Sequence, residues 1–256
     1  MARIVDLSKT IRYDKRDPWW MRAKVSRVDH KLGGLQIRLF FGLPQKLFPK
    51  DFIGWAADTL KIGTHSSTHL DAPWHYHSTS GGKKAKTIDK VPLDWCYGPG
   101  VVIDMTGKPD FEQITVEDLE RDISRSGAEI KPGTIVLIRT GNDRYDHTPE
   151  YTKKGTGMSR EATEWLVDRG VRIIGIDQWG FDLPLGYMAE EAKRRDAPDY
   201  FWQAHLVGRE KEYCHIEQLT NLEELPAYGF KVAVFPLKIE GGSAAPARVV
   251  AIFEDE

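Results

Sequence analysis

The sequence predicts an α/β layered domain, in which helices pack against a sheet of mostly buried strands. Two observations carry this prediction. Short β-branched runs recur along the chain, and many of them are apolar on both faces, as are the strands of a covered sheet. Twice, a helix signal and a glycine turn are followed at once by such a run, which is the order of elements in an α/β layer.

Seven runs are predicted as strands from their β-branched and apolar residues. They are residues 4–7, 35–41, 101–105, 134–139, 171–176, 231–237 and 247–253. Residues 13–34 and 183–204 show no clear periodicity and are predicted as surface loops, with a lid or a binding loop as the alternative.

Two helices have clear start and stop signals. Thr115 and Asp118 have the spacing of a capping box, which predicts a helix that runs to about Ser126. A second helix is predicted to begin after Ser159 and to stop at Gly170.

Composition is that of an ordinary globular protein, with 41% hydrophobic and 29% charged residues. A formal net charge of -2 gives no basic excess, so we expect neither a nucleic-acid partner nor an anionic membrane surface. Cys96 and Cys214 are too few and too far apart for a disulfide framework or a thiolate zinc site. Without a signal-peptide pattern or a long apolar run, the expectation is a soluble, cytoplasmic protein.

The chemistry is concentrated in the stretch His65-Ser-Ser-Thr-His69-Leu-Asp71-Ala-Pro-Trp-His75. With His77, four of the eight histidines fall within thirteen residues. Imidazole binds zinc, iron, manganese or copper, and a nearby carboxylate shifts the preference toward zinc or manganese. This clustering predicts a metal site, with His77 as a bystander.

The spacing of these ligands requires a bent segment. On an ideal strand His65 and His69 would lie about 13 Å apart, too far for one ion with bonds of about 2.1 Å. On a helix the two would meet, but Asp71 would point about 120° away from His65. Gly63 before the motif and Pro73 within it favour a bend that points the three side chains inward. We also expect an oxygen beside the non-ligating nitrogen of His65 or His69.

The pattern His65-x-Ser-Thr-His69-x-Asp71-Ala-Pro-x-His75 resembles the signature of the putative cyclase family, which includes bacterial kynurenine formamidase and isatin hydrolase. Downstream, His205 and, twelve positions later, Glu217 are similar to the family's later His and Glu segment. The resemblance extends over nearly the whole chain.

The resemblance implies roles for these residues. His65, His69 and Asp71 are expected to bind the metal, and Asp71 to bridge to a second ion that His205 and Glu217 complete. The cofactor is one or two ions of zinc or manganese. His75 is the expected proton-transfer residue, with a fourth metal ligand as the alternative. The resemblance also implies a single β/β/α, swivelling-type domain over residues 1–256, with a mixed sheet and helices packed on it, as a homo-oligomer.

The implied activity is hydrolysis of an amide, lactam or formamide C–N bond in a small molecule by a metal-activated water, as in an arylformamidase. Where compact kynurenine formamidases have Asp-Thr-Pro-Ser, this chain has Asp177-Gln-Trp-Gly, which weakens the expectation of N-formylkynurenine as substrate. The candidate pocket residues are aromatic and indicate an aromatic substrate; they are Trp74, Trp179, Phe201 and Trp202.

Two alternatives remain open. One is a structural or sensory metal-binding protein without turnover, whose site would be closed by four protein ligands. The other keeps the site and changes the reaction, to a lactone hydrolase or a cyclase.

Overall fold

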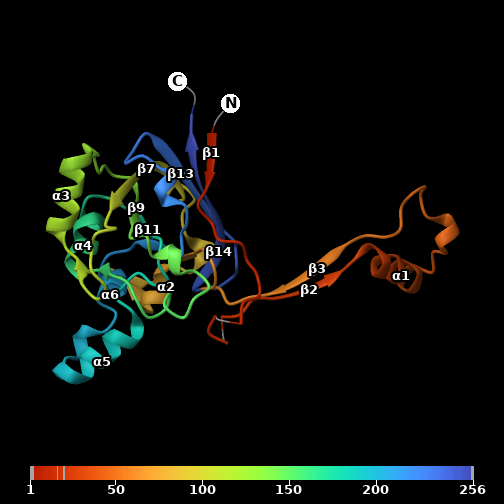
Figure 1. Cartoon of the computed structure of the whole chain (residues 1–256), viewed down its shortest axis with the longest axis horizontal. Coiled ribbons are helices and arrows are strands. Elements are labelled where there is room, and N and C mark those ends of the chain that lie inside the picture. The colour runs from red at the N-terminus through yellow and green to blue at the C-terminus, as the bar shows by residue number, and fades with distance from the viewer. Residues whose placement is uncertain (1–2, 16, 20, 255–256) are drawn as a thin grey trace. The chain divides into compact units, whose positions relative to one another are not determined.

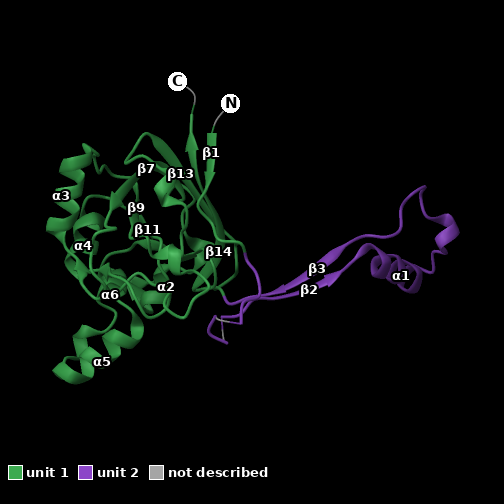
Figure 2. Cartoon of the chain, viewed as in Figure 1, with its two compact units in different colours: residues 1–10, 64–256 green, residues 11–63 purple. Residues whose placement is uncertain are grey.

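The computed structural model describes residues 3–15, 17–19 and 21–254 and divides into two compact units. The first unit comprises residues 1–10 and 64–256, and the second comprises residues 11–63 (Figure 2). The expectation that residues 1–256 form a single domain stays a prediction.

The first unit is built on a mixed sheet, seven strands of which close into a ring. The ring order is β14 (Ala244–Phe253), β13 (Phe230–Pro236), β7 (Tyr97–Asp104), β9 (Ile135–Arg139), β11 (Ile173–Ile176), β12 (Cys214–Glu217) and β4 (His69–Asp71). The pairing of β4 with β14 completes it, and β1 (Arg3–Asp6) adds to the other end of β14. Strands β7, β9, β11 and β12 run parallel to one another.

Each side of the parallel strands faces its own hydrophobic core. In β9, Ile135 and Leu137 belong to one core with residues of the other ring strands, while Val136 and Ile138 belong to a second core. That second core also holds residues of the helices α3 (Val116–Ser126), α4 (Arg160–Asp168) and α6 (Gln203–Glu210), which lie on one side of the sheet (Figure 1). The two cores explain why the parallel strands are apolar on both faces, and the mixed sheet with packed helices confirms the predicted α/β class.

Local signals located eight of the nine predicted helices and strands correctly. Six predicted runs correspond to β1, β7, β9, β11, β13 and β14. The capping box of α3 is formed, because the Asp118 backbone N–H donates to Thr115 Oγ1 at 3.3 Å and the Thr115 N–H donates to Asp118 Oδ2 at 3.0 Å. Ser159 caps α4 by accepting from the Ala162 N–H at 3.0 Å.

The strand predicted at residues 35–41 is wrong, because this run forms the second half of helix α1 (His30–Phe41). Asp29 caps the helix by accepting from the Leu32 N–H at 2.9 Å, and Gly42 ends it with a φ of 64°. The second unit also contains an antiparallel pair of strands, β2 (Lys24–Val28) and β3 (Ala57–Lys61). Residues 13–34 are therefore not a simple loop either.

The loop predicted at residues 183–204 is also wrong, since it contains helix α5 (Leu185–Arg195) and the start of α6. The strong helix formers Ala189-Glu-Glu-Ala-Lys-Arg-Arg195 outweigh the neighbouring aromatics and prolines. The remaining short helices and strands are η1 (Gln45–Leu47), α2 (Pro73–Tyr76), β5 (Thr79–Ser80), β6 (Lys83–Lys84), η2 (Ile88–Lys90), β8 (Gln113–Ile114), η3 (Asn142–Tyr145), β10 (Gly157–Met158), η4 (Pro198–Tyr200) and η5 (Leu222–Glu224). Within the described residues, no helix combines the length and apolar character needed to cross a membrane.

Candidate metal centre

The histidine motif is bent, as its spacing requires. Ser67 adopts a left-handed backbone with a φ of 61°, and the rings of His65 and His69 lie 5.3 Å apart. Strand β4 then begins at His69 and pairs on one side with β12, which places His69 opposite Glu217. Pro73 starts helix α2 immediately after this strand. Bend, strand and helix together point the polar side chains of the motif into one place.

Asp71 is fully buried and lies at the centre of the cluster. Its Oδ1 is 2.8 Å from His65 Nδ1 and 3.2 Å from His69 Nε2. Its Oδ2 is 3.1 Å from His215 Nε2 and 3.6 Å from His75 Nε2. One carboxylate therefore faces two different pairs of imidazoles.

Glu217 supplies a second buried carboxylate at the end of β12. Its Oε1 lies 3.4 Å from His215 Nε2 and 3.7 Å from His205 Nε2, and its Oε2 lies 3.6 Å from His69 Nε2. The Phe181 backbone N–H donates to Oε1 at 2.9 Å and fixes the carboxylate. The structure thus brings together all six residues expected at the metal or in proton transfer: His65, His69, Asp71, His75, His205 and Glu217.

Two residues of the cluster were missed by the sequence analysis. His215 precedes Glu217 by two positions on β12, so both side chains leave the same face of the strand. Assigning Cys214–Glu217 as a strand would have revealed this pair. Asp182 lies far from the motifs in sequence, and its Oδ2 is 2.5 Å from His205 Nδ1.

Aromatic rings hold the imidazoles in place. His215 lies between Phe181, with ring centroids 4.4 Å apart, and Tyr76, with centroids 5.0 Å apart. Trp202 stacks on His205 at 4.2 Å and lies 5.1 Å from His75. Such packing limits rotation of the rings and fixes the direction of their nitrogens.

Of the four aromatic residues predicted to line the pocket, the structure places Trp202 at the cluster. Trp74 and Phe201 are each 38% exposed. Trp179 is half-buried. A pocket role for these four residues stays a prediction.

In both His65 and His69, the ring nitrogen that points away from Asp71 has an oxygen partner. This confirms the expected oxygen beside the non-ligating nitrogen of His65 or His69. His69 Nδ1 lies 2.8 Å from the Ser67 carbonyl oxygen, and His65 Nε2 lies 2.9 Å from Ser243 Oγ. Such partners set the tautomer of a metal-binding histidine and orient its free nitrogen.

The inner atoms of the cluster lack the hydrogen bonds that buried polar groups require. Within the described part of the chain, His69 Nε2, both carboxylate oxygens of Asp71 and His215 Nε2 are buried without a hydrogen-bond partner. Around a tetrahedral ion with bonds of about 2.1 Å, neighbouring ligand atoms lie about 3.4 Å apart. The separations of 3.1 to 3.7 Å between His215, Glu217 and their partners match this value. The donor set of imidazole and carboxylate fits zinc or manganese.

Burial and charge shift the pKa values within the cluster. Burial favours a protonated Asp71, but the charge of His69 and contacts with His215 and His65 hold the pKa of Asp71 well below its usual value. Burial alone would lower the pKa of His215, yet contacts with Asp71 and Glu217 raise it to about 9. A buried carboxylate that stays ionised requires positive charge beside it, which either an imidazolium or a divalent ion supplies.

His75 differs from the other histidines, because burial lowers its pKa to about 3 despite the nearby carboxylate of Asp71. Its side chain is 24% exposed, so it lies at the open edge of the cluster. His75 is therefore neutral near pH 7.

Asp182→Asn is expected to weaken metal binding by about 10- to 100-fold, because the Asp182 carboxylate orients His205. Metal affinity measured by calorimetric titration of the metal-free chain tests this effect. The matched control is Asp199→Asn on the exposed surface, which should bind metal like the parent. Equal affinities for the two variants would show that Asp182 does not position the ligand.

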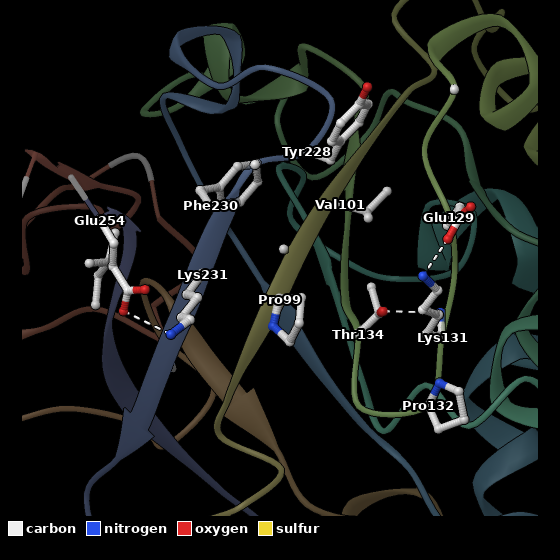
Figure 3. Close-up of a pocket in the computed structure, with 14 residues that line it drawn as sticks. Pro99, Val101, Glu129, Lys131, Pro132, Thr134, Tyr228, Phe230, Lys231 and Glu254 are labelled. Carbon is white, nitrogen blue, oxygen red and sulfur yellow. Dashed lines mark hydrogen bonds and ion pairs between the residues drawn. The ribbon is translucent and has the colours of Figure 1, made fainter. Parts of the chain in front are cut away.

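A surface cavity of about 730 Å³ lies apart from the histidine cluster, beside the beginnings of the parallel strands β7 and β9 (Figure 3). Its lining contains no histidine. Its charged residues pair with one another: Lys131 with Glu129, and Lys231 with Glu254. Glu217, by contrast, ends the parallel strand β12, so this cavity is separate from the histidine cluster.

The chain resembles known proteins over most of its length. Residues 5–183 match the family model described as putative cyclase. The isatin hydrolase of Roseibium aggregatum is 28% identical over 212 residues, which cover 78% of this chain and 75% of that protein. The kynurenine formamidase of Salinibacter ruber is 26% identical over 198 residues, which cover 75% of this chain and 77% of that protein.

A solved structure shares the fold. Isatin hydrolase A from Ralstonia solanacearum superposes with a TM-score of 0.76 at 26% identity, covering 99% of this chain and 92% of that one.

Proposed function

Because the chain belongs to the putative cyclase family, we propose that it is a metal-dependent hydrolase that cleaves an amide, lactam or formamide C–N bond of a small molecule. The observation that carries this proposal is the set of buried, unpaired donor atoms around Asp71. The similarity to an isatin hydrolase and to a kynurenine formamidase supports the same type of reaction.

The catalytic ion, zinc or manganese, is assigned to His65, His69 and Asp71, with Asp71 bridging toward a second ion at His205 and Glu217. This assignment is supported by the two-sided position of Asp71, whose Oδ1 faces His65 and His69 while its Oδ2 faces the other group. A bound divalent ion would lower the pKa of a water and polarise the carbonyl of the substrate.

His75 takes the role of proton transfer. Its Nε2 lies 3.6 Å from Asp71 Oδ2, close enough to reach a water held beside that carboxylate. The imidazole lies at the half-exposed edge of the cluster, where it would accept the proton of an attacking water and return it to the leaving nitrogen.

The substrate class is proposed to be an aromatic amide or lactam. Trp202 supports this choice, since its ring lies beside His75 and His205 at the half-exposed edge of the cluster. Trp74, Trp179 and Phe201 are proposed to extend the same aromatic surface. A lactone hydrolase or cyclase that uses the same site remains the alternative reaction.

A purely structural metal site is less well supported. Structural sites are closed by their protein ligands, whereas the side chains of His65 and His75 are 29% and 24% exposed. This opening gives a water and a substrate access to Asp71 from the side of His65 and His75.

Assembly and location belong to the same proposal. We propose that residues 1–256 act as one swivelling-type domain within a homo-oligomer of the cytoplasm. The buried, free thiols of Cys96 and Cys214 suit a reducing compartment. Light scattering of the purified chain tests the oligomer, and a monomer would contradict it.

Removal of the metal should abolish activity. We expect a chelator to stop the hydrolysis of isatin or of an aryl formamide, and added zinc or manganese to restore it. Rate and metal content are measured on the same samples, so that activity can be compared with ions per chain. Full activity in a metal-free preparation would overturn the proposed function.

A further inference from the structure

The two carboxylate oxygens of Asp71 face groups of side chains that differ in solvent exposure. On the Oδ1 side lie His65, with a 29% exposed side chain, and His69. On the Oδ2 side, beyond the half-exposed His75 at 3.6 Å, Asp71 forms a group with three other buried residues: His205, His215 and Glu217. Within this group each residue offers one ligand atom, and the four atoms all lie within 4.8 Å of one another.

His215 is the member of this group to which the proposed function gives no role. Its Nε2 is 3.1 Å from Asp71 Oδ2 and 3.4 Å from Glu217 Oε1, yet this nitrogen has no hydrogen-bond partner among the described residues. These lengths are near the edge of about 3.4 Å of a tetrahedral coordination shell. A buried imidazole nitrogen directed between two carboxylates, with no hydrogen bond to either, has the position of a metal ligand.

The surroundings of His215 hold the ring in this direction. Phe181 and Tyr76 stack on its two sides, and its backbone N–H donates to Tyr76 Oη at 3.0 Å. The close position of Tyr76 depends on Gly208 of α6, where a Cβ would fall 2.0 Å from Tyr76 Cδ2. The far ring nitrogen, Nδ1, lies 3.4 Å from Tyr213 Oη. His215 is therefore preorganised to present Nε2 to the carboxylates.

We propose that His215 is a metal ligand and that it closes, together with Asp71, His205 and Glu217, a buried site of four protein ligands for a divalent ion. This inference rests on the proposed function and extends it. Sites closed by four protein ligands serve structure, and sites with an open position serve catalysis. The two halves of the cluster therefore differ, with a closed site that fixes Asp71 and an open one at His65 and His69 that exchanges its ion and water.

The test is metal binding by the full chain, with cobalt(II) and zinc as probes. We expect the parent to retain one ion per chain after dialysis against a weak chelator and to bind a second one reversibly. His215→Ala should lose the retained ion, with affinity falling by more than about 100-fold, beyond the loss typical of a residue that only orients a ligand. The visible spectrum of retained cobalt should be that of a four-coordinate ion and should be absent from His215→Ala.

The control is His77→Ala, an exposed histidine that lies 3.0 Å from Thr79 Oγ1 and should behave as the parent. Should His215→Ala not fold, zinc titration of nitrogen-15 labelled parent decides the question, because a ligand shows a large shift at the ring nitrogen of His215. Retention of the tight ion by folded His215→Ala, or an unshifted ring nitrogen, would overturn the role of His215. A parent that binds no ion at all would instead contradict the proposed function.

Discussion

Asp71→Ala is expected to lose bound metal and hydrolytic activity together, with a fall in kcat of more than about 10⁴-fold, greater than the loss from removing a general acid or base. The reason is geometric. Oδ1 lies 2.8 Å from His65 Nδ1, and Oδ2 lies 3.1 Å from His215 Nε2, so one side chain serves both halves of the cluster. Removing it leaves the two groups of imidazoles without the charge that balances a divalent ion.

Asp71→Asn is the matched variant, because it keeps the volume of the side chain and removes only the charge. We expect it to lose metal almost as completely as Asp71→Ala, while its thermal stability without metal shows whether the core is intact. Metal content by mass spectrometry and kcat are measured on the same samples of both variants. If Asp71→Asn kept its metal and its turnover, Asp71 would be a packing residue and the proposed centre would be wrong.

The fold was predictable where the signal is local. Thr115 and Asp118 lie three residues apart and cap the same helix turn, so the start of α3 is visible in the sequence. The wrong prediction at α1 has the opposite cause, because contacts between residues distant in the sequence are involved there. Gly33 lies against the Trp55 carbonyl, where a Cβ would fall 1.9 Å from the oxygen, and this approach involves residues more than twenty positions apart. Contacts of that kind leave no periodic pattern in the sequence.

Closure of the sheet into a ring could not be predicted either, because it depends on pairing between strands that are distant in the sequence. Strand β4 has only three residues, and it pairs with both β12 and β14, which places Asp71 opposite His215 and Ala244. A three-residue strand with two polar side chains has no hydrophobic alternation, so only the paired neighbours define it. This pairing also brings the motif next to the strand that carries Glu217.

The residues of the candidate site that lie close together in the sequence were predictable, and those that lie far apart were not. His65, His69, Asp71 and His75 fall in one short stretch, whereas the assignment of His205 and Glu217 depended on family resemblance. Asp182 contacts His205 across twenty-three positions, and His215 gains its meaning only from the register of β12. Sequence alone therefore revealed neither the residue that orients His205 nor the histidine that β12 adds to the cluster.

His75→Ala is expected to keep its metal and lose turnover, with kcat falling by about 10²- to 10⁴-fold, as for removal of a general acid or base. His75 follows Pro73 on the short helix α2, beyond the strand that carries His69 and Asp71. Its Nε2 is 3.6 Å from Asp71 Oδ2, whereas His65 Nδ1 is 2.8 Å from Oδ1. At this longer separation His75 Nε2 makes no hydrogen bond to the carboxylate, so the nitrogen is available to a water at the half-exposed edge of the cluster.

Metal content separates proton transfer from ligation at His75, because both roles predict a loss of turnover. The control is again His77→Ala, which lies two positions away and should keep both metal and activity. We expect parent, control and His75→Ala to hold the same number of ions, with KM for an aromatic lactam changed far less than kcat. If His75→Ala were metal-free, His75 would be a ligand together with His65 and Asp71, as its position near these two residues also permits. The proton would then be carried by Glu217, whose Oε2 lies 3.6 Å from His69 Nε2, or by a residue not named above.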